Sequence, residues 1–181
     1  MARIPEIPVA QLTDAQRLVH DQIAGARAGA VAGPFAIWLH VPQIADRANQ
    51  FGNTIRLQGA LEKRLFELIV LITARHWSSQ YEWFAHQDAA LKAGLSPEIV
   101  EAIRARRAPD FTHDDERLIF EIVTELYETR TVSQGTYDRA LKQFGPELLI
   151  EAITTAGFYT MAAMVINSFD APVPGGGRPL P

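Results

Sequence analysis

The stretch that decides the fold is residues 67–94, ELIVLITARHWSSQYEWFAHQDAALKAG. It begins with an almost unbroken apolar run that contains one carboxylate, Glu67. Aromatic residues and two histidines follow, and the stretch ends in an alanine-rich segment before Gly94. A charged group in apolar surroundings is costly unless it is paired or takes part in chemistry. We therefore expect this stretch to contain the functional site.

Residues 62–76 are predicted to form a central helix, because apolar side chains surround it on all sides and its charged start, EKRLFE, favours a helix. The β-branched residues of this segment would also suit a strand, but no turn residues bound the run. A break near Trp77 then leads to a second helix over residues 79–93, which Gly94 ends. We expect these two consecutive helices to organise the fold.

The rest of the chain is also predicted to be helical, with helix starts marked by cap residues and prolines. These expected starts are Thr13, Pro42, Ser96, Thr112, Ser133 and Pro146. Together they predict an all-α, single-domain bundle of seven to eight helices, with residues 62–76 and 146–169 at its centre.

We divide the chain into three parts. Residues 1–34 form an N-terminal segment with one helix and a Gly/Ala loop over 25–34, which is either mobile or closes over a pocket. Residues 35–169 form the helical domain. Residues 170–181 are a Pro/Gly-rich tail that is either disordered or laid over a neighbour.

The composition excludes several classes of protein. The net charge is −4 without a long basic stretch, so nucleic-acid binding has no support. The absence of cysteine excludes disulfides, thiolate metal sites and thiol redox chemistry run by this chain alone. No apolar run approaches the roughly 18 residues of a membrane span, and the N-terminus lacks the apolar core of a secretory signal. We expect a cytoplasmic protein whose longest apolar runs, 65–74 and 156–166, are buried helices.

Potential proton carriers are spaced so that they share one helix face. Glu82 and His86 are four residues apart, and Ser79 lies one turn before Glu82. Glu67 belongs to the preceding helix. If the two helices pack antiparallel, Glu67 faces the stripe formed by Ser79, Glu82 and His86.

This spacing resembles the motif of the carboxymuconolactone decarboxylase and alkylhydroperoxidase D superfamily. The motif is a Glu, eleven residues, Cys-x-x-Cys, three residues and a His. Glu67, Ser79, Glu82 and His86 occupy these positions in register. The resemblance covers roughly residues 35–169 and is strongest over 61–105. It implies an alkylhydroperoxidase D-like helical fold.

The chain departs from the motif at both cysteine positions, where Ser79 and Glu82 stand. A thiol peroxidase activity, which the resemblance to the redox branch would imply, is therefore disfavoured. The sequence around Tyr81 and Trp83 resembles the cysteine-free, decarboxylase-like branch instead. That resemblance implies cofactor-independent decarboxylation of 4-carboxymuconolactone or a similar unsaturated lactone in aromatic catabolism. It also implies a homo-oligomer, a trimer or a hexamer.

The hypothesis assigns His86 as the general acid and Glu82 or Glu67 as its partner. A buried Glu67 without a partner would have a raised pKa and would itself be a proton donor. The candidate substrate-binding residues are Ser79, Tyr81, Trp83, Trp38, His40 and Arg75.

Structural roles remain open beside these functional ones. Glu67 would equally suit a buried ion pair with Arg56 or Arg75, and Glu82 with His86 would suit a pair on a helix surface. Ser79 is more typical of a helix N-cap than of a nucleophile. The aromatic residues are more typical of packing than of ligand stacking. No metal site is predicted, since di-iron bundles use a Glu-x-x-His spacing of three on paired helices.

Two other functions remain open. One is a proton-transfer isomerase that uses the same Glu and His pair. The other is a non-catalytic oligomer that binds a small ligand. Each of the three interpretations requires a small-molecule ligand and no cofactor, nucleic acid or membrane.

Overall fold

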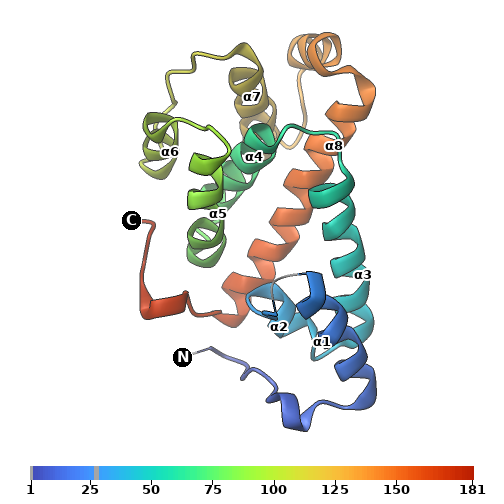
Figure 1. The fold of residues 1–181 in the computed structure, drawn as a ribbon. Helices are drawn as coiled ribbons and strands as arrows, with labels where there is room; N and C mark the ends of the chain where they lie inside the picture. The colour runs from blue at the N-terminus through green and yellow to red at the C-terminus, as the bar shows by residue number, and fades with distance from the viewer. Residues whose placement is uncertain (1, 27–28) are drawn as a thin grey trace.

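The computed structural model describes residues 2–26 and 29–181. In this part of the chain it contains eight α-helices and no strand, which confirms the all-α prediction (Figure 1). Residues 27 and 28 of the predicted Gly/Ala loop lie outside the described residues. The helices are α1 (Asp14–Ala26), α2 (Pro34–Trp38), α3 (Pro42–Asn53), α4 (Lys63–His76), α5 (Gln80–Lys92), α6 (Pro97–Arg104), α7 (Asp114–Thr129) and α8 (Gln134–Phe169).

Helix α4 is the centre of the molecule. All of its residues from 65 to 75 are buried, and α5, α7 and α8 pack against it. Burying one Leu, Ile or Val side chain contributes roughly 1.5–3 kcal/mol, so this helix supplies a large share of the folding free energy. The prediction that protein surrounds residues 62–76 is confirmed for residues 65–75, whereas Glu62, Lys63 and His76 at the two ends are exposed.

A tight turn sends α5 back along α4. The Ser79 N–H bonds the Ala74 carbonyl at 2.8 Å, and Ser78 takes the left-handed conformation with φ of 49°. The two helices then run side by side in opposite directions, with Glu67 of α4 in contact with His86 of α5. This is the antiparallel arrangement on which the predicted constellation depends.

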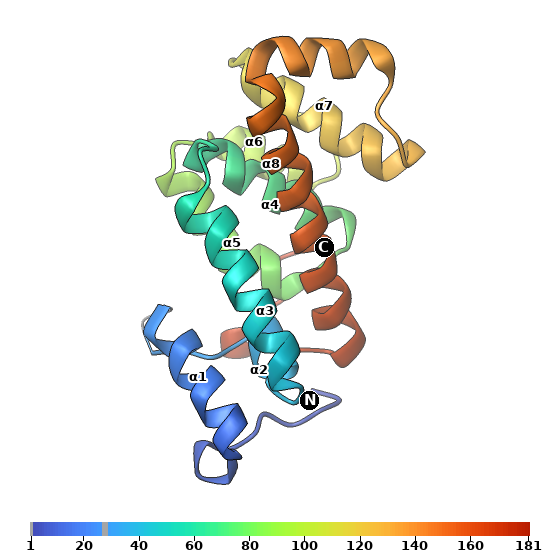
Figure 2. The same cartoon turned by 90° about the vertical axis from the view of Figure 1, so that its right-hand side faces the viewer.

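Helix α8 is bent at Gly145, whose φ of 70° interrupts the helical conformation before Pro146 (Figure 2). The two helices expected on either side of this bend are therefore the two arms of α8. By length and hydropathy α8 would be able to cross a membrane, but half of its most apolar window is buried inside the protein. It packs against α4 and α7 as a core helix does.

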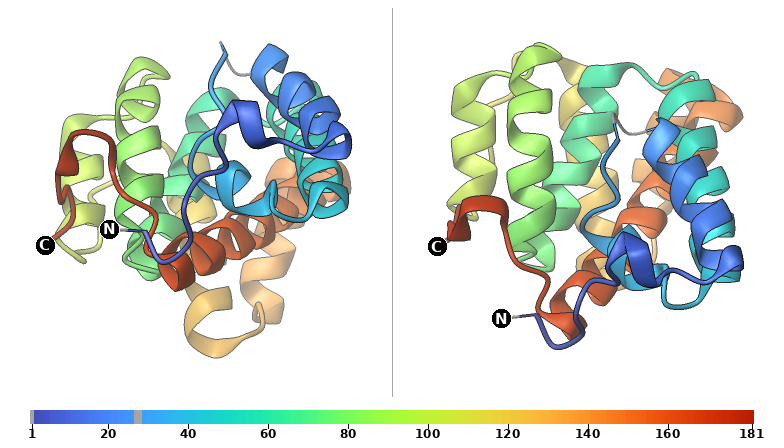
Figure 3. Two further views of the ribbon diagram at one scale, coloured as in Figure 1. Left: turned by 90° about the horizontal axis from the view of Figure 1, so that it is seen from below. Right: turned by 60° about the horizontal axis from the view of Figure 1, so that its bottom comes forward.

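Both terminal segments lie against the helices (Figure 3). At the N-terminal end, the Arg3 N–H bonds the Phe169 carbonyl at 2.8 Å. In the tail, Leu180 is 3% exposed and exchanges hydrogen bonds with the Gln80 side chain at 2.9 and 3.2 Å. On α6, Arg104 Nε donates to the Pro179 carbonyl at 2.7 Å. The tail is therefore laid over α5 and α6 of its own chain rather than left free.

Candidate active site

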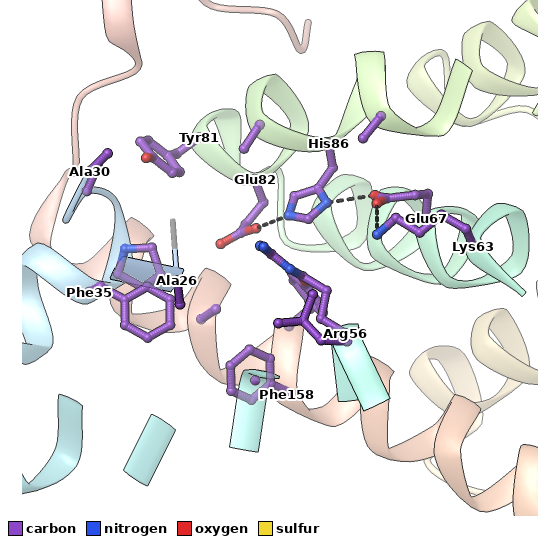
Figure 4. Close-up of a pocket in the computed structure, with 18 residues that line it drawn as sticks. Ala26, Ala30, Phe35, Arg56, Lys63, Glu67, Tyr81, Glu82, His86 and Phe158 are labelled. Carbon is purple, nitrogen blue, oxygen red and sulfur yellow. Dashed lines mark hydrogen bonds and ion pairs between the residues drawn. The ribbon is translucent and has the colours of Figure 1, made fainter. Parts of the chain in front are cut away.

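A cavity of about 840 Å³ lies among α2, α3, α4, α5 and α8. Most of its wall is apolar and aromatic, and one side carries ionisable groups. The large apolar lining residues are Phe35, Leu57, Tyr81, Phe158 and Tyr159. The ionisable lining residues are Arg56, Lys63, Glu67, Glu82 and His86, drawn in Figure 4. An apolar cavity with a few convergent polar groups is typical of a small-molecule site.

The centre of the polar side is a hydrogen bond between Glu67 and His86. His86 Nδ1 lies 2.7 Å from Glu67 Oε2, and both side chains are largely buried. Lys63, one turn before Glu67 on α4, places its Nζ 2.7 Å from Glu67 Oε1. Each carboxylate oxygen of Glu67 therefore has a cationic or N–H donor.

This pairing decides the protonation state of Glu67. Burial alone would raise its pKa, but the hydrogen bonds and charges of His86 and Lys63 outweigh burial and lower the pKa. Glu67 is thus a carboxylate, and His86 donates its Nδ1–H to it. The condition under which Glu67 would be the proton donor, a buried carboxyl without a partner, is not met.

The other ring nitrogen of His86 faces Glu82. His86 Nε2 lies 3.5 Å from Glu82 Oε2, and Glu82 is 4% exposed. The Tyr159 ring meets the imidazole edge-on, with centroids 5.1 Å apart. Because Glu67 fixes Nδ1 and Tyr159 fixes the ring plane, Nε2 has a defined direction at the cavity wall. An imidazole held in this way can give or take one proton at Nε2.

Arg56 is a cation of the cavity wall that does not take part in the pairing of Glu67 with Lys63 and His86. It belongs to a π-helical turn, Thr54–Gln58, that extends α3, and its side chain is half-buried in the cavity wall. It makes no hydrogen bond or ion pair with any residue that the structure describes. Figure 4 shows it reaching toward the side of the cavity where Glu82 and His86 lie. Such turns are frequent at functional sites, and the guanidinium fork matches a carboxylate.

The structure therefore rejects the proposed pairing of Glu67 with Arg56 or Arg75, since Lys63 and His86 take those places. The role of Lys63 was missed, although its spacing of four residues from Glu67 is the signal for such a pair. Arg56 was considered only as a structural partner. No spacing in the sequence indicates that a π-helical turn aims it into the cavity.

Among the candidate substrate-binding residues, Tyr81 lines the cavity. Its ring packs against Gly33, where a Cβ would lie only 2.3 Å from Tyr81 Cε1. Trp38 lies one layer behind the wall, with its ring 5.2 Å from that of Phe35 and 6.4 Å from that of Phe158. Trp38 thus supports two lining residues and does not line the cavity itself.

The other candidates lie elsewhere, each for a local reason. His40 Nε2 bonds the Pro5 carbonyl at 3.0 Å and fastens the N-terminal segment. Trp83 follows Glu82 by about 100° around α5, so its ring is fully buried and its Nε1 donates to Gln87. Arg75 lies eight residues, about 12 Å, along α4 from Glu67 and lines a different cavity. Their assignment to substrate binding is not supported by contact with the cavity.

Ser79 is fully buried and does not line the cavity either. It occupies the N-cap position of α5, as its residue type indicates, but its side chain makes no capping hydrogen bond. Its Oγ has no hydrogen-bond partner among the described residues.

Within residues 2–26 and 29–181, no group of three or more His, Asp or Glu side chains is arranged to hold a metal ion. At the polar wall, Glu67 already accepts from Lys63 on one oxygen and from His86 on the other. A metal ion bound beside Glu67 would need His86 Nδ1 as a ligand, and this nitrogen is already hydrogen-bonded to Glu67.

The comparisons with known proteins agree with this fold. Residues 42–125, from α3 to within α7, match the model of the carboxymuconolactone decarboxylase family. A crystal structure of an uncharacterized peroxidase-related protein from Silicibacter sp. TM1040 is similar, with a TM-score of 0.75 over 94% of this chain and 90% of that chain. Its sequence identity is 15%, so the likeness shows the fold alone. No curated protein matches the chain.

Proposed function

Since the chain carries the carboxymuconolactone decarboxylase family region over residues 42–125, we propose that it is a cofactor-independent carboxy-lyase. Its proposed substrate is a small unsaturated lactone or acid, with 4-carboxymuconolactone as the first candidate. The observation that carries the proposal is the hydrogen bond that fixes His86 at the wall of an apolar cavity, with Arg56 in the same wall.

The proposed reaction needs no electron sink other than the substrate. When the bond between the γ-carbon and its carboxylate breaks, CO2 leaves and the electron pair moves through the conjugated C=C bond to the lactone carbonyl. The resulting dienolate takes a proton at the carbon next to the carbonyl. The net change is the loss of CO2 and the gain of one proton, so no oxidant or reductant is consumed.

His86 supplies that proton in the proposal. An imidazolium here has its Nδ1–H on Glu67 and its Nε2–H on the side of Glu82 and the cavity. After Nε2 gives up its proton, Glu67 keeps the neutral ring in the same orientation with the hydrogen on Nδ1. Bulk water then restores the proton. General acid catalysis of this kind contributes about 10²- to 10⁴-fold in rate.

Arg56 supplies the electrostatic part of the proposal. Its guanidinium would hold a substrate carboxylate and face the negative charge that develops on the lactone oxygen. Lys63 is less suited to this role because Glu67 already neutralises it at 2.7 Å. The apolar wall around Phe35, Phe158 and Tyr159 would surround the body of the substrate and limit water near the reacting carbon.

The protein from Silicibacter sp. TM1040 with the similar fold is described as peroxidase-related. A thiol peroxidase requires a cysteine that can be oxidised, and this chain has none. Decarboxylation is the superfamily chemistry that a His and carboxylate site supports without thiols.

The test is turnover of 4-carboxymuconolactone by the purified protein after treatment with a chelator. We expect CO2 release and loss of ultraviolet absorbance, with a rate about 10²- to 10⁴-fold lower in His86→Ala. His113→Ala is the matched control, because His113 is exposed and lies outside the cavity. Near-native turnover by His86→Ala would overturn the assignment of the proton donor.

We also propose that the protein is a homo-oligomer. This rests on apolar side chains that α8 leaves exposed, among them Ile150 at 65% and Met164 at 49%. Exposed apolar surface of this kind on a long helix is typical of a subunit contact. Light scattering at micromolar protein tests the proposal, and a single monomer peak would contradict it.

A further inference from the structure

A second cavity, of about 290 Å³, lies between the C-terminal ends of α4 and α6 and the side of α7. His76 lines it, nine residues after Glu67 on α4. Nine residues at 100° each place the two side chains half a turn apart, on opposite sides of the helix. The second cavity is thus separate from the one that holds His86.

The charges of this cavity are nearly all positive. Arg75, Arg106 and Arg107 line it, and Glu128, which is exposed, is the one acidic residue in its described lining. Arg75 is only 8% exposed. None of the three arginines has an ion pair within the described part of the chain. Burial and the charges of Arg106 and Arg104 lower the pKa of Arg75. Cations gathered without a counter-ion repel one another, so an anion would be favoured here.

Two of these arginines, Arg75 and Arg106, donate hydrogen bonds to the same hydroxyl group, that of Ser78. Ser78 Oγ accepts hydrogen bonds from Arg75 Nη1 at 3.2 Å and from Arg106 Nη2 at 3.0 Å. Ser78 and Arg106 both take the left-handed conformation, with φ of 49° and 56°. Such conformations cost of order 1–3 kcal/mol each in residues other than glycine, and they cluster at ligand sites.

Capping of helix ends accounts for part of this arrangement. Arg75 Nε donates to the Arg104 carbonyl at 2.7 Å, and Arg106 Nη2 donates to the Arg75 carbonyl at 3.3 Å. These bonds leave donors over. Several N–H donors have no acceptor among residues 2–26 and 29–181. They are Arg75 Nη2, Arg106 Nε and Nη1, and the whole Arg107 guanidinium. Capping alone therefore does not explain three arginines at one cavity.

We propose that Arg75, Arg106 and Arg107 form a binding site for a small oxyanion, a phosphate or a carboxylate group. We call these three residues the arginine site. Guanidinium groups bind both kinds of oxyanion through paired N–H donors. The stacked rings of His76 and Tyr127, 4.3 Å apart, form one wall beside it. The arginine site is independent of the decarboxylase proposal.

The test is a calorimetric titration with inorganic phosphate and, separately, with succinate, each at constant ionic strength. Both titrations use the Arg56→Gln variant, so that the unpaired cation of the first cavity does not contribute. We expect at least one of the two anions to bind saturably with one equivalent per chain. Saturation by phosphate alone identifies a phosphate site, and saturation by succinate alone identifies a carboxylate site.

Three further variants in the same background locate the binding. Arg107→Gln and Arg106→Gln should each weaken it at least tenfold. Arg117→Gln is the control, because Arg117 is exposed on α7 and pairs with Asp114, and it should change the Kd less than twofold. Arg107 makes no side-chain hydrogen bond with a described residue, so its variant should fold normally. The proposal is overturned if neither anion saturates, or if Arg117→Gln weakens binding as much as Arg107→Gln does.

Discussion

The two cavities on either side of α4 hold their charged side chains in opposite ways. In the first, Glu67 is neutralised by Lys63 and His86, and Glu82 lies beside the same imidazole. In the second, Arg75, Arg106 and Arg107 meet without a carboxylate partner in the described residues. The first network is complete apart from Arg56. In the second, no described carboxylate pairs with the three arginines, and the one acidic lining residue, Glu128, is exposed.

The difference separates a reaction site from a binding site. A carboxylate that fixes the tautomer of one histidine prepares a proton transfer, because the proton is held at a defined atom. Cations without a counter-charge prepare only the binding of an anion. Removing a charge should therefore have opposite consequences in the two cavities, and this contrast can be tested.

The largest expected effect is that of Glu67→Gln on turnover. The amide cannot hold His86 as a carboxylate does, so the ring loses its fixed tautomer. By analogy with the carboxylate of serine-protease triads, the rate should fall by about 10²- to 10⁴-fold with little change in KM. Steady-state kinetics measure this change. ¹⁵N resonances of the imidazole report the tautomer independently, and an unchanged Nδ1–H signal would contradict the explanation.

Arg56→Gln should have the next largest effect. Losing a hydrogen bond to a charged group costs about 1.5–3 kcal/mol, so KM should rise roughly 10- to 150-fold. Arg56→Lys should restore only part of the loss, because an ammonium lacks the planar fork. Arg47→Gln, in an exposed residue of α3, is the matched control. If the rate constant falls while KM stays the same, Arg56 acts on the transition state and not on binding.

The pairing of Glu67 also predicts how stability depends on pH. The pKa of Glu67 in the folded protein is lowered from its ordinary value of 4.5, so its contribution to stability is present above that value. The contribution is lost as the pH falls through the lower, folded-state pKa. Thermal unfolding of the wild type and Glu67→Gln should therefore show a difference in Tm that is constant near neutral pH and shrinks below pH 4.5. A difference that widens in acid would contradict the sign of the shift.

Much of the first cavity was predictable because its key contacts follow from helical spacing. Glu82 and His86 share a face of one helix, and the short break at Trp77 makes that helix return along α4 toward Glu67. Lys63 obeys the same rule and could have been predicted. Both pairs follow from the spacing of four residues along a helix, which the packing of the helices does not alter.

The remainder depended on tertiary structure. Arg56 reaches the cavity through a π-helical turn that no simple pattern indicates. Trp83 differs from Glu82 by one position, and that 100° rotation turns it from the cavity into the core. Arg75 lies in the last turn of α4, and Arg106 and Arg107 follow the end of α6. Arg106 has a positive φ, which the sequence does not indicate.

The smallest predicted effect lies in the second cavity and has the opposite sign. Arg107→Gln removes one of several like charges and no hydrogen bond with a described residue, so in anion-free buffer of low ionic strength it should raise Tm slightly. The gain should disappear in 1 M salt, where the Debye length is about 3 Å. Arg117→Gln, which breaks a pair with Asp114, should show no such gain. Calorimetry of the three proteins at both ionic strengths makes the comparison. A lower Tm for Arg107→Gln at low salt would mean that Arg107 already has a counter-charge, and the two cavities would then not differ as argued.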